Sequence, residues 1–575
     1  MISKWNYLPL TPEQERIGAT LEESYPQCPT LCRLLAQRGV TSVAETETFF
    51  KPQLSDLHDP FLMKDMHKAV DRLNRAIGAK ERIMIYGDYD VDGTTAVALV
   101  YKFLMNYYSG LYYYVPDRYE EGYGISTKSI DFAAEHNISL IITLDCGIKA
   151  VERIAYARTK GIDFIICDHH VPDNQLPDAV AILNPKLDDE PYPYKHLSGC
   201  GVGYKFMQGF AISNGLDVAN DLEPLLDLVA VSIVSDIVPI TGENRILTYH
   251  GLRRLNGNAS VGLRAIIRVC QLQSKKNITI SDIIFKIGPR INASGRMQSG
   301  KEAVDLLVSR DYNEAYRKSR EIDQYNEDRK ELDKRITEEA NEILQQHIDI
   351  ENRRSIVIYN KDWHKGIIGI VASRFTELYY RPAVVLTLSE GLATGSARSV
   401  QGFDIYKAVE SCRDLLENFG GHTYAVGLSL KEEHIKEFSQ RFEEYVAQNI
   451  EPAQTTPQID IDTELDFSEI TGEFVSILRR FNPFGPGNNK PTFCTRMVKD
   501  YGTSRLVGRQ QEHLKLELVD SKSGSILNCI AFNKKKYYEY IKSGKPFDIC
   551  YTIEDNQRGD DIQLLIRDIH CEGIE

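Results

Sequence analysis

The sequence predicts an α/β protein in which two α/β domains are joined by a long helix and followed by a C-terminal β-barrel. Three observations lead to this fold class. Short apolar runs alternate with helical stretches from Ile83 onward, residues 313–353 form one highly charged helical pattern, and short strands with turn signals fill the chain after residue 458. Apolar strands that alternate with helices are typical of a parallel sheet covered on both faces. Closely spaced short strands are typical of a barrel or a sandwich.

The elements are expected in the following order. Residues 1–80 are a mixed, mainly helical lead-in to the first α/β domain (81–312), and the charged helix (313–353), the second α/β domain (354–450) and the barrel (458–575) follow. The helix carries only a thin apolar stripe, and a helix this polar bridges domains rather than filling a core. The Pro- and Thr-containing segment 451–457 is the expected linker before the barrel.

The composition is that of a globular protein. The chain has 575 residues, 82 acidic and 68 basic side chains, and a formal net charge of −14. An acidic balance argues against a generally basic nucleic-acid coat, but not against a nuclease with an acidic metal cluster and a local basic channel. No apolar run approaches the roughly 20 residues that span a bilayer, and no signal peptide is indicated. The 11 cysteines form no C-x-x-C pair, so we expect reduced thiols, no structural zinc and a cytoplasmic protein.

Acidic residues follow the first predicted strand directly. Asp88, Asp90 and Asp92 alternate along the segment and are followed by a glycine. An EF-hand loop would need a glutamate at its twelfth position, where this chain has Leu99. The remaining interpretation is a strand that turns into a helix and presents Asp90 and Asp92 to a metal. For Asp88, helix capping or orientation of a ligand is as good an interpretation.

Three further apolar runs end in the same kind of residue. We interpret the runs 140–144, 164–167 and 228–234 as strands, and they lead into Asp145, into Asp168, His169 and His170, and into Asp236. Ligands of open α/β sheets gather at the carboxyl ends of the strands. Carboxylates with one or two imidazoles suit Mn²⁺ or Mg²⁺, and two such ions about 4 Å apart can clamp a displacement at phosphorus. A single strand-end aspartate is more often a helix cap, but a cluster of them without a cation would repel itself.

Basic residues and glycines mark the expected substrate contacts. Arg118 follows a predicted strand, and Arg290 and Arg296 flank Asn292 in what we expect to be a glycine-containing loop. Planar guanidinium groups suit phosphate oxygens, although a surface ion pair is the ordinary role of a single arginine. In the second α/β domain, Gly395 to Ser399 includes Arg398. The paired glycines Gly420 and Gly421, which precede His422, allow close approach of the backbone to a ligand.

The ordered set of these motifs resembles the DHH phosphoesterase superfamily, and within it the single-strand-specific exonucleases. The motifs that carry the resemblance are Asp90-Val-Asp92, Asp145, Asp168-His169-His170, Asp236, Val115 to Gly124, Leu197 to Gly203, Gly288 to Met297, Trp363-His364, Gly395 to Ser399 and Gly420 to His422. Together they extend over nearly the whole chain. The resemblance implies a DHH catalytic domain, a substrate-binding DHHA1 domain and an OB-fold barrel, whose aromatic and basic side chains would bind a single strand.

The resemblance also implies roles for single residues. Two Mn²⁺ ions, with Mg²⁺ as an alternative, would be held by Asp90, Asp92, Asp145, His169 and Asp236. Asp145 would bridge the ions, and His170 would face the scissile phosphate; Asp145, Asp168 and His170 are the expected catalytic residues. Arg118, Arg290, Asn292, Arg296, Arg398, Ser399, Gly420, Gly421 and His422 would contact substrate. Tyr86 stands where some relatives have a histidine ligand, so the first metal is expected to bind more weakly.

The expected activity is 5′→3′ degradation of single-stranded DNA to nucleoside 5′-monophosphates in repair and recombination. The resemblance suggests a monomer that works with a RecQ-type helicase and a single-strand-binding protein, without a membrane partner. A phosphodiesterase for cyclic dinucleotides or short oligoribonucleotides is the alternative, and a non-catalytic repair scaffold on the same fold is the third hypothesis. No Gly-x-x-x-x-Gly-Lys-Ser/Thr loop occurs, so an ATP-driven motor is not supported.

Overall fold

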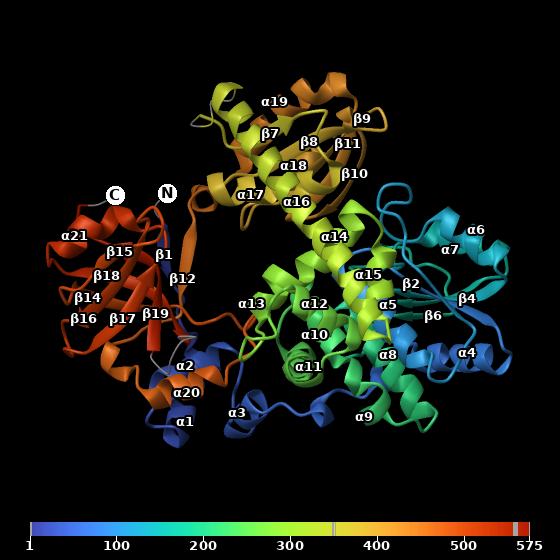
Figure 1. Cartoon of the computed structure of the whole chain (residues 1–575), viewed down its shortest axis with the longest axis horizontal. Helices are drawn as coiled ribbons and strands as arrows, with labels where there is room; N and C mark the ends of the chain where they lie inside the picture. The colour runs from blue at the N-terminus through green and yellow to red at the C-terminus, as the bar shows by residue number, and fades with distance from the viewer. Residues whose placement is uncertain (1–2, 348–349, 351, 556–561, 574–575) are drawn as a thin grey trace.

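The computed structural model describes residues 3–347, 350, 352–555 and 562–573. It confirms the predicted fold class, with a parallel-sheet domain, a smaller α/β domain and a C-terminal barrel arranged around the centre of the molecule (Figure 1). No helix in the described part of the chain combines the length and the apolar character needed to cross a membrane.

The first domain is built on a five-stranded sheet of order β3-β2-β4-β5-β6 in which every pair is parallel. Its strands are β2 (Arg82–Gly87), β3 (Leu111–Tyr114), β4 (Ile138–Leu144), β5 (Asp163–Cys167) and β6 (Ala181–Leu183). Helices α4 (Met66–Gly78), α5 (Val91–Leu104) and α8 (Gly199–Ser213) cover one face, and α6 (Thr127–Glu135) and α7 (Val151–Thr159) cover the other. Both faces are buried, which explains the uninterrupted apolar strands.

The alternation of strands and helices ends earlier than we expected. Between β6 and α16, all the regular elements that the structure describes are helical: α8, α9 (Val218–Asp221), α10 (Leu226–Ser235), α11 (Gly242–Asn258), α12 (Val261–Val269), α13 (Ile280–Asp282), a π-helical turn (Ile283–Ile287), α14 (Gly288–Met297) and α15 (Gly300–Leu307), besides short 3₁₀ turns. The prediction of a strand over 228–234 is therefore wrong. A short apolar run fits a buried helix as well as a buried strand, and α10 is buried on all sides in the domain core.

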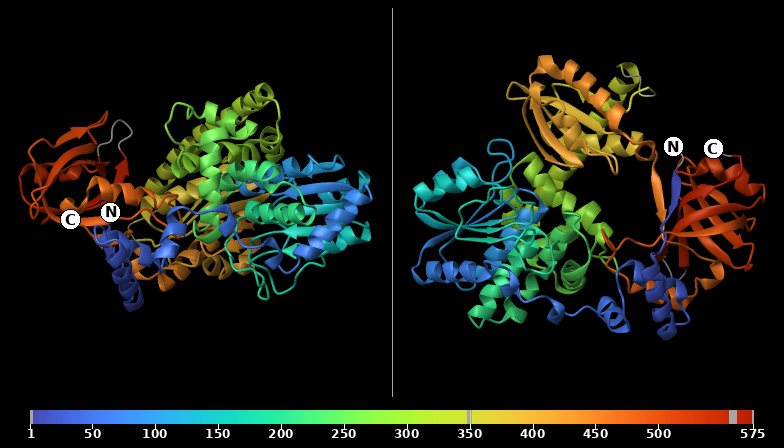
Figure 2. Two further views of the ribbon diagram at one scale, coloured as in Figure 1. Left: turned by 90° about the horizontal axis from the view of Figure 1, so that it is seen from below. Right: turned by 180° about the vertical axis from the view of Figure 1, so that it is seen from behind.

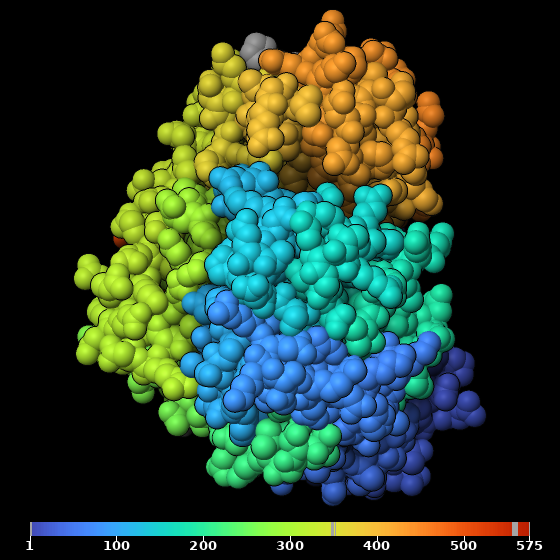
Figure 3. Space-filling view, turned by 90° about the vertical axis from the view of Figure 1, so that its right-hand side faces the viewer, coloured from blue at the N-terminus to red at the C-terminus, as the bar shows by residue number. Residues whose placement is uncertain are grey.

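Helix α16 (Tyr312–His347) connects the two α/β domains. It packs on α12 and α14 of the first domain and on α17 (Lys365–Tyr379) of the second. The second sheet has the order β10-β11-β9-β8-β7, and only its β7–β8 pair is parallel. Its other elements are β7 (Ile356–Tyr359), β8 (Ala383–Ser389), β9 (Leu392–Arg398), α18 (Ile405–Glu410), β10 (Leu416–His422), β11 (Ala425–Leu430) and α19 (Ile435–Asn449). Figure 3 shows this domain resting directly on the first one.

The C-terminal domain is a closed barrel. Strands β14 (Phe493–Asp500), β18 (Phe547–Asp555), β19 (Ile562–His570), β17 (Ile526–Ala531) and β16 (His513–Asp520) pair in that order, and a β14–β16 pairing closes the ring. The remaining elements are β12 (Gln458–Ile461), β13 (Thr463–Glu464), α20 (Gly472–Arg479), β15 (Arg505–Val507) and α21 (Tyr538–Lys542). Closure removes the exposed edges of the sheet.

The N-terminal region differs from the expected lead-in to the first domain. Strand β1 (Lys4–Tyr7) pairs with β12 beside the barrel (Figure 2), and α1 (Pro12–Ser24), α2 (Pro29–Gln37) and α3 (Val43–Phe50) contribute to the core that contains α20 and the barrel. Of the described N-terminal helices, α4 is the one that packs on the first sheet. An amphipathic pattern shows that one helix face is buried, but not which partner covers it.

Candidate metal centre and strand-binding surface

The carboxyl ends of neighbouring parallel strands bring the predicted metal-binding residues together. Asp90 is the N-cap of α5, directly after β2, and Asp92 lies in the first turn of that helix. Asp145 follows β4 with a φ of 60°, a left-handed conformation that aspartate adopts more readily than most residues. His169 and His170 follow β5, whereas Asp236 is the C-cap of helix α10 and not a strand-end residue.

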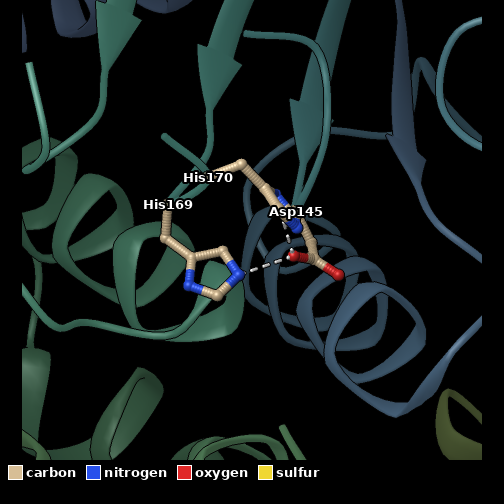
Figure 4. A group of neighbouring side chains, drawn as sticks. All are labelled: Asp145, His169 and His170. Atoms are coloured by element: carbon tan, nitrogen blue, oxygen red, sulfur yellow. Dashed lines mark ion pairs between the residues drawn. The ribbon is translucent and has the colours of Figure 1, made fainter. Parts of the chain in front are cut away.

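His169 lies at the centre of this cluster. Its Nε2 atom is 3.0 Å from Asp145 Oδ1, 3.6 Å from Asp236 Oδ2 and 3.7 Å from Asp92 Oδ2. Two groups have ligand atoms within 4.8 Å of one another, namely Asp145 with His169 and His170 (Figure 4), and Asp92 with His169 and Asp236. The structure does not place Asp90 in either group. Its carboxylate instead accepts a hydrogen bond from the backbone N–H of Gly93.

The residues present fit a divalent metal. Both ring nitrogens of His169 are buried and have no hydrogen-bond partner among the described residues, which is costly unless another group satisfies them. Burial, followed by the charges of Asp92 and Asp90, raises the pKa of Asp145, and the same causes raise the pKa of Asp236 to about 9. A bound cation reverses this electrostatic situation, because it favours the ionised carboxylates.

Asp168 holds His170 rather than lying among the possible ligands. Its carboxylate accepts hydrogen bonds from the backbone N–H groups of Ile148, His169 and His170 and lies 2.7 Å from His170 Nδ1. Burial opposes ionisation, but these contacts prevail and lower the pKa of Asp168 to about 2. Burial alone would lower the pKa of His170, yet the bond to Asp168 raises it. The pair therefore fixes the orientation of the imidazole.

Helix α8 positions Asp92. The backbone N–H groups of Gly199 and Cys200 donate to its two carboxylate oxygens at 2.7 and 2.8 Å, and the Ser232 hydroxyl donates at 2.6 Å. A Cβ on Gly199 would lie 2.5 Å from the Asp145 Cβ. The helix start thus touches both Asp92 and Asp145.

Two further residues lie near the metal-binding cluster but belong to neither ligand group. Asp88 is buried and lies in neither ligand group, and burial and the charge of Asp90 raise its pKa. Tyr86 donates its hydroxyl to the Gly124 carbonyl at 2.6 Å.

Three arginines form a cationic cluster at the junction of the two α/β domains. Burial, then Arg118, Arg329 and Arg398, lowers the pKa of Arg296 to about 9, and burial and Arg118 lower that of Arg398. Within the described ranges, Arg118, Arg296 and Arg398 have no carboxylate within salt-bridge distance, and the Nε of Arg118 is buried without a partner. Guanidinium groups that lack carboxylates suit a phosphate.

Several residues that we expected to contact substrate lie in a different secondary structure, or have different partners, from those predicted. Arg290, Asn292 and Arg296 lie in helix α14 and not in a loop, because Gly288-Pro289 starts a helix there. Arg290 is paired with Asp323 at 2.7 Å, which leaves it less suited to a phosphate. Arg296 donates to the Gly366 carbonyl across the domain junction.

The expected contacts of the second domain lie on strands or directly after one. Arg398 ends β9, Gly420, Gly421 and His422 end β10, and Ser399 donates its hydroxyl to the Phe403 carbonyl. His422 is largely exposed. Partial loss of solvent around its ring, then the charges of Lys149, His170 and Lys186, lowers its pKa, so it lies on the side of the metal cluster.

Sequence reasoning missed three residues of this region. The Tyr123 hydroxyl donates to the Asp145 carbonyl and lies 3.3 Å from the His170 ring. Lys186 is half-buried near Asp236 and Asp168. Arg329 extends the arginine cluster from α16, and its Nε is buried without a partner. Tyr123 stands inside a quoted motif and could have been noticed, but Arg329 is one of many charged residues on a polar helix.

Three family models match the chain. They are the DHH family N-terminal domain over residues 82–233, the DHHA1 domain over 352–448 and the RecJ OB domain over 461–568. The single-stranded-DNA-specific exonuclease RecJ of Bacillus subtilis is 35% identical over 99% of this chain and 71% of its own length. The Escherichia coli protein of the same name is 34% identical over 94% of this chain and 96% of its own.

Solved structures share the fold. RecJ of Thermus thermophilus in complex with Mn²⁺ has a TM-score of 0.84 at 24% identity, with 100% of this chain and 80% of that chain covered. An exonuclease RecJ bound to manganese has a TM-score of 0.60 at 30% identity, with 70% of this chain and 98% of that chain covered. The identities to the Bacillus and Escherichia proteins, over most of both lengths, show that the chain belongs to the family of the single-stranded-DNA-specific exonuclease RecJ.

Proposed function

We propose that this protein is a metal-dependent exonuclease that degrades single-stranded DNA from the 5′ end to nucleoside 5′-monophosphates. The observation that carries the proposal is the position of His169, whose ring nitrogens make no hydrogen bond among the described residues and whose Nε2 lies within 3.7 Å of carboxylate oxygens of Asp145, Asp92 and Asp236. The arginine cluster beside this centre supplies cations for a phosphate, and curated relatives are named single-stranded-DNA-specific exonucleases.

We assign the metal ligands as Asp92, Asp145, His169 and Asp236, with Asp90 as a further ligand and Mn²⁺ or Mg²⁺ as the ions. Structures of the Thermus thermophilus protein contain these two metals. Bound divalent ions supply an activated water and neutralise charge at phosphorus. His170, held at Nδ1 by Asp168, would hold or move a proton at the reacting phosphate through Nε2, which lies 3.3 Å from the Tyr123 hydroxyl. Arg118, Arg296, Arg398 and His422 bind and orient phosphate oxygens.

We assign the domains by the same reasoning. Residues 81–312 form the catalytic domain, 354–450 the substrate-binding domain, and 458–575 the barrel that holds the strand. The barrel also argues against the alternative of a phosphodiesterase for dinucleotides, which has no use for a second binding module.

We further propose a cytoplasmic monomer that acts in repair and recombination, with a helicase of the RecQ type and a single-strand-binding protein as partners. Strand binding should weaken with salt, because phosphate contacts release counterions.

A timed digest tests the polarity and the product. We expect 5′-labelled single strands to lose their label as mononucleotide at the earliest times, and 3′-labelled strands to shorten progressively, in the presence of Mn²⁺ or Mg²⁺. Double strands of the same sequence should resist. Early release of a 3′ label, or an oligonucleotide as the first product, would contradict the proposed direction.

Arg118→Gln tests the phosphate contact. A charge-assisted hydrogen bond contributes about 1.5–3 kcal/mol, so we expect the KM for a single strand to rise roughly 10- to 100-fold. The change is structurally mild, since the guanidinium lies 4.2 Å from the Tyr89 ring and its buried Nε has no hydrogen-bond partner among the described residues. Steady-state kinetics measures the effect, and Arg320→Gln on the exposed face of α16 is the control. An unchanged KM would remove Arg118 from the substrate site.

A further inference from the structure

Arg245 of helix α11 is buried at the junction between the first domain and the C-terminal region. It is 4% exposed, and its guanidinium donates to the carbonyl oxygens of Phe49, Arg480, Phe481, Asn482 and Pro483. The guanidinium also lies 3.9 Å from the centre of the Phe49 ring. No carboxylate of the described residues pairs with it, and burial, followed by Arg38, lowers its pKa to about 9.

Burying the guanidinium in this way lowers folding stability unless the hydrogen bonds that it makes fix a particular geometry. A buried charge without a counter-ion is costly, and here backbone carbonyl dipoles satisfy it from two separate parts of the chain. Four of the five carbonyls belong to residues 480–483, which connect α20 to the barrel strand β14. The fifth, of Phe49, belongs to the N-terminal helices that share the barrel's core. Only a planar guanidinium offers enough donors in a fixed fork to bind both.

The same junction continues toward the metal centre. The backbone N–H of Ile240 donates to the Pro486 carbonyl at 2.7 Å, and a Cβ on Gly485 would lie 2.5 Å from the Ile240 Cδ1. Asn244, beside Arg245, donates to the Pro239 carbonyl at 2.9 Å. The segment from Asp236 to Arg245 therefore has the metal cluster at one end and the barrel's connection at the other. Figure 1 shows the segment after α20 reaching across to the first domain near α11.

We propose that Arg245 is a positioning residue that fixes the barrel relative to the metal centre and so determines how tightly long single strands are held. The inference rests on the proposed nuclease function. A strand long enough to reach the barrel is bound at two places, and the gain from the second depends on a fixed distance between them. A dinucleotide cannot reach the barrel, so its hydrolysis is independent of Arg245. Residues 480–487 and 237–245 thus act as one rigid support.

Arg245→Lys tests this assignment, because lysine keeps the charge but offers a single donor point. We expect the KM for a 40-nucleotide oligothymidylate to rise at least about 10-fold, while kcat and KM for the dinucleotide pTpT stay within about twofold of the unmodified protein. Small-angle X-ray scattering should show a larger radius of gyration. Arg253→Lys, on the exposed side of the same helix, is the control and should change neither substrate's kinetics nor the scattering.

A second variant tests the same assignment even if Arg245→Lys does not fold. Gly485→Val adds side-chain atoms against Ile240 on the barrel side of the same junction. It should likewise raise the KM for the long strand and leave the kinetics of the dinucleotide nearly unchanged. An equal loss on both substrates, or an unchanged KM for the long strand together with unchanged scattering, would overturn the assignment. Release of mononucleotides from the 40-nucleotide oligothymidylate by the unmodified protein tests the nuclease function itself, so the two failures are distinguishable.

Discussion

Replacement of Asp145 by alanine is expected to reduce nucleotide release at least about a thousandfold, which corresponds to roughly 4 kcal/mol of transition-state stabilisation. Among the carboxylates that pair with His169 Nε2 in the described residues, that of Asp145 is the nearest, with 3.0 Å between Oδ1 and Nε2. It is also buried, and burial with the charges of Asp92 and Asp90 raises its pKa. Removal of this group takes away one ligand of the group that Asp145 forms with His169 and His170.

Two measurements on this variant separate chemistry from binding. Mn²⁺ affinity, followed by calorimetry, should fall, and the affinity for single strands, followed by fluorescence anisotropy, should stay largely intact because the arginine cluster and the barrel are unchanged. Asp71→Ala, on the exposed face of α4, serves as the matched control and should keep full activity. Near-normal turnover by the Asp145 variant would refute the metal assignment.

Replacement of Gly199 by alanine is expected to impair the metal centre without removing any ligand. The new Cβ would lie 2.5 Å from Asp145 Cβ and 2.8 Å from its Cα, distances at which the chain must move. Overpacking of this kind costs about 1–3 kcal/mol of folding stability. A shift of Asp145, and of Asp92 through its bond to the Gly199 N–H, should also lower activity by roughly a hundredfold, the scale expected for misplaced catalytic groups.

Thermal unfolding and kinetics together identify this effect. We expect a lower Tm, weaker Mn²⁺ binding and partial recovery of activity at high Mn²⁺ concentration. Gly257→Ala in α11 is the control, because a Cβ added there would meet no heavy atom of a neighbouring segment within 4 Å; it should leave Tm and activity nearly unchanged. A Gly199 variant with normal metal affinity would show that the contact with Asp145 has no functional consequence.

Local patterns in the sequence were sufficient for much of the site. The strands that end at Asp145 and Asp168 were predictable because each is a short apolar run, and the ends of adjacent parallel strands meet at one edge of a sheet. The residue Asp236 was found for the wrong reason. Its apolar run is the helix α10, since a short run buried on all sides has no periodicity that separates helix from strand.

Local sequence patterns could not predict which contacts each arginine makes. Arg290 and Arg296 looked equivalent in sequence, yet the structure pairs Arg290 with Asp323 and leaves Arg296 without a carboxylate among the described residues. Arg245 gave no signal, because its partners are backbone carbonyls, which every residue has. Whether a cation is neutralised depends on which distant segments fold against it.

The sequence by itself determined the order of the domains, the family resemblance and most residues of the candidate metal centre, because strand endings and motif spacings are properties of neighbouring residues. The tertiary structure decided the rest. It brought His169 Nε2 within 3.7 Å of three carboxylates, gathered arginines from both α/β domains, and attached helices α1 to α3 to the barrel instead of the first domain. These features depend on packing between segments far apart in the chain, and amphipathic patterns specify that a face is buried without specifying its partner.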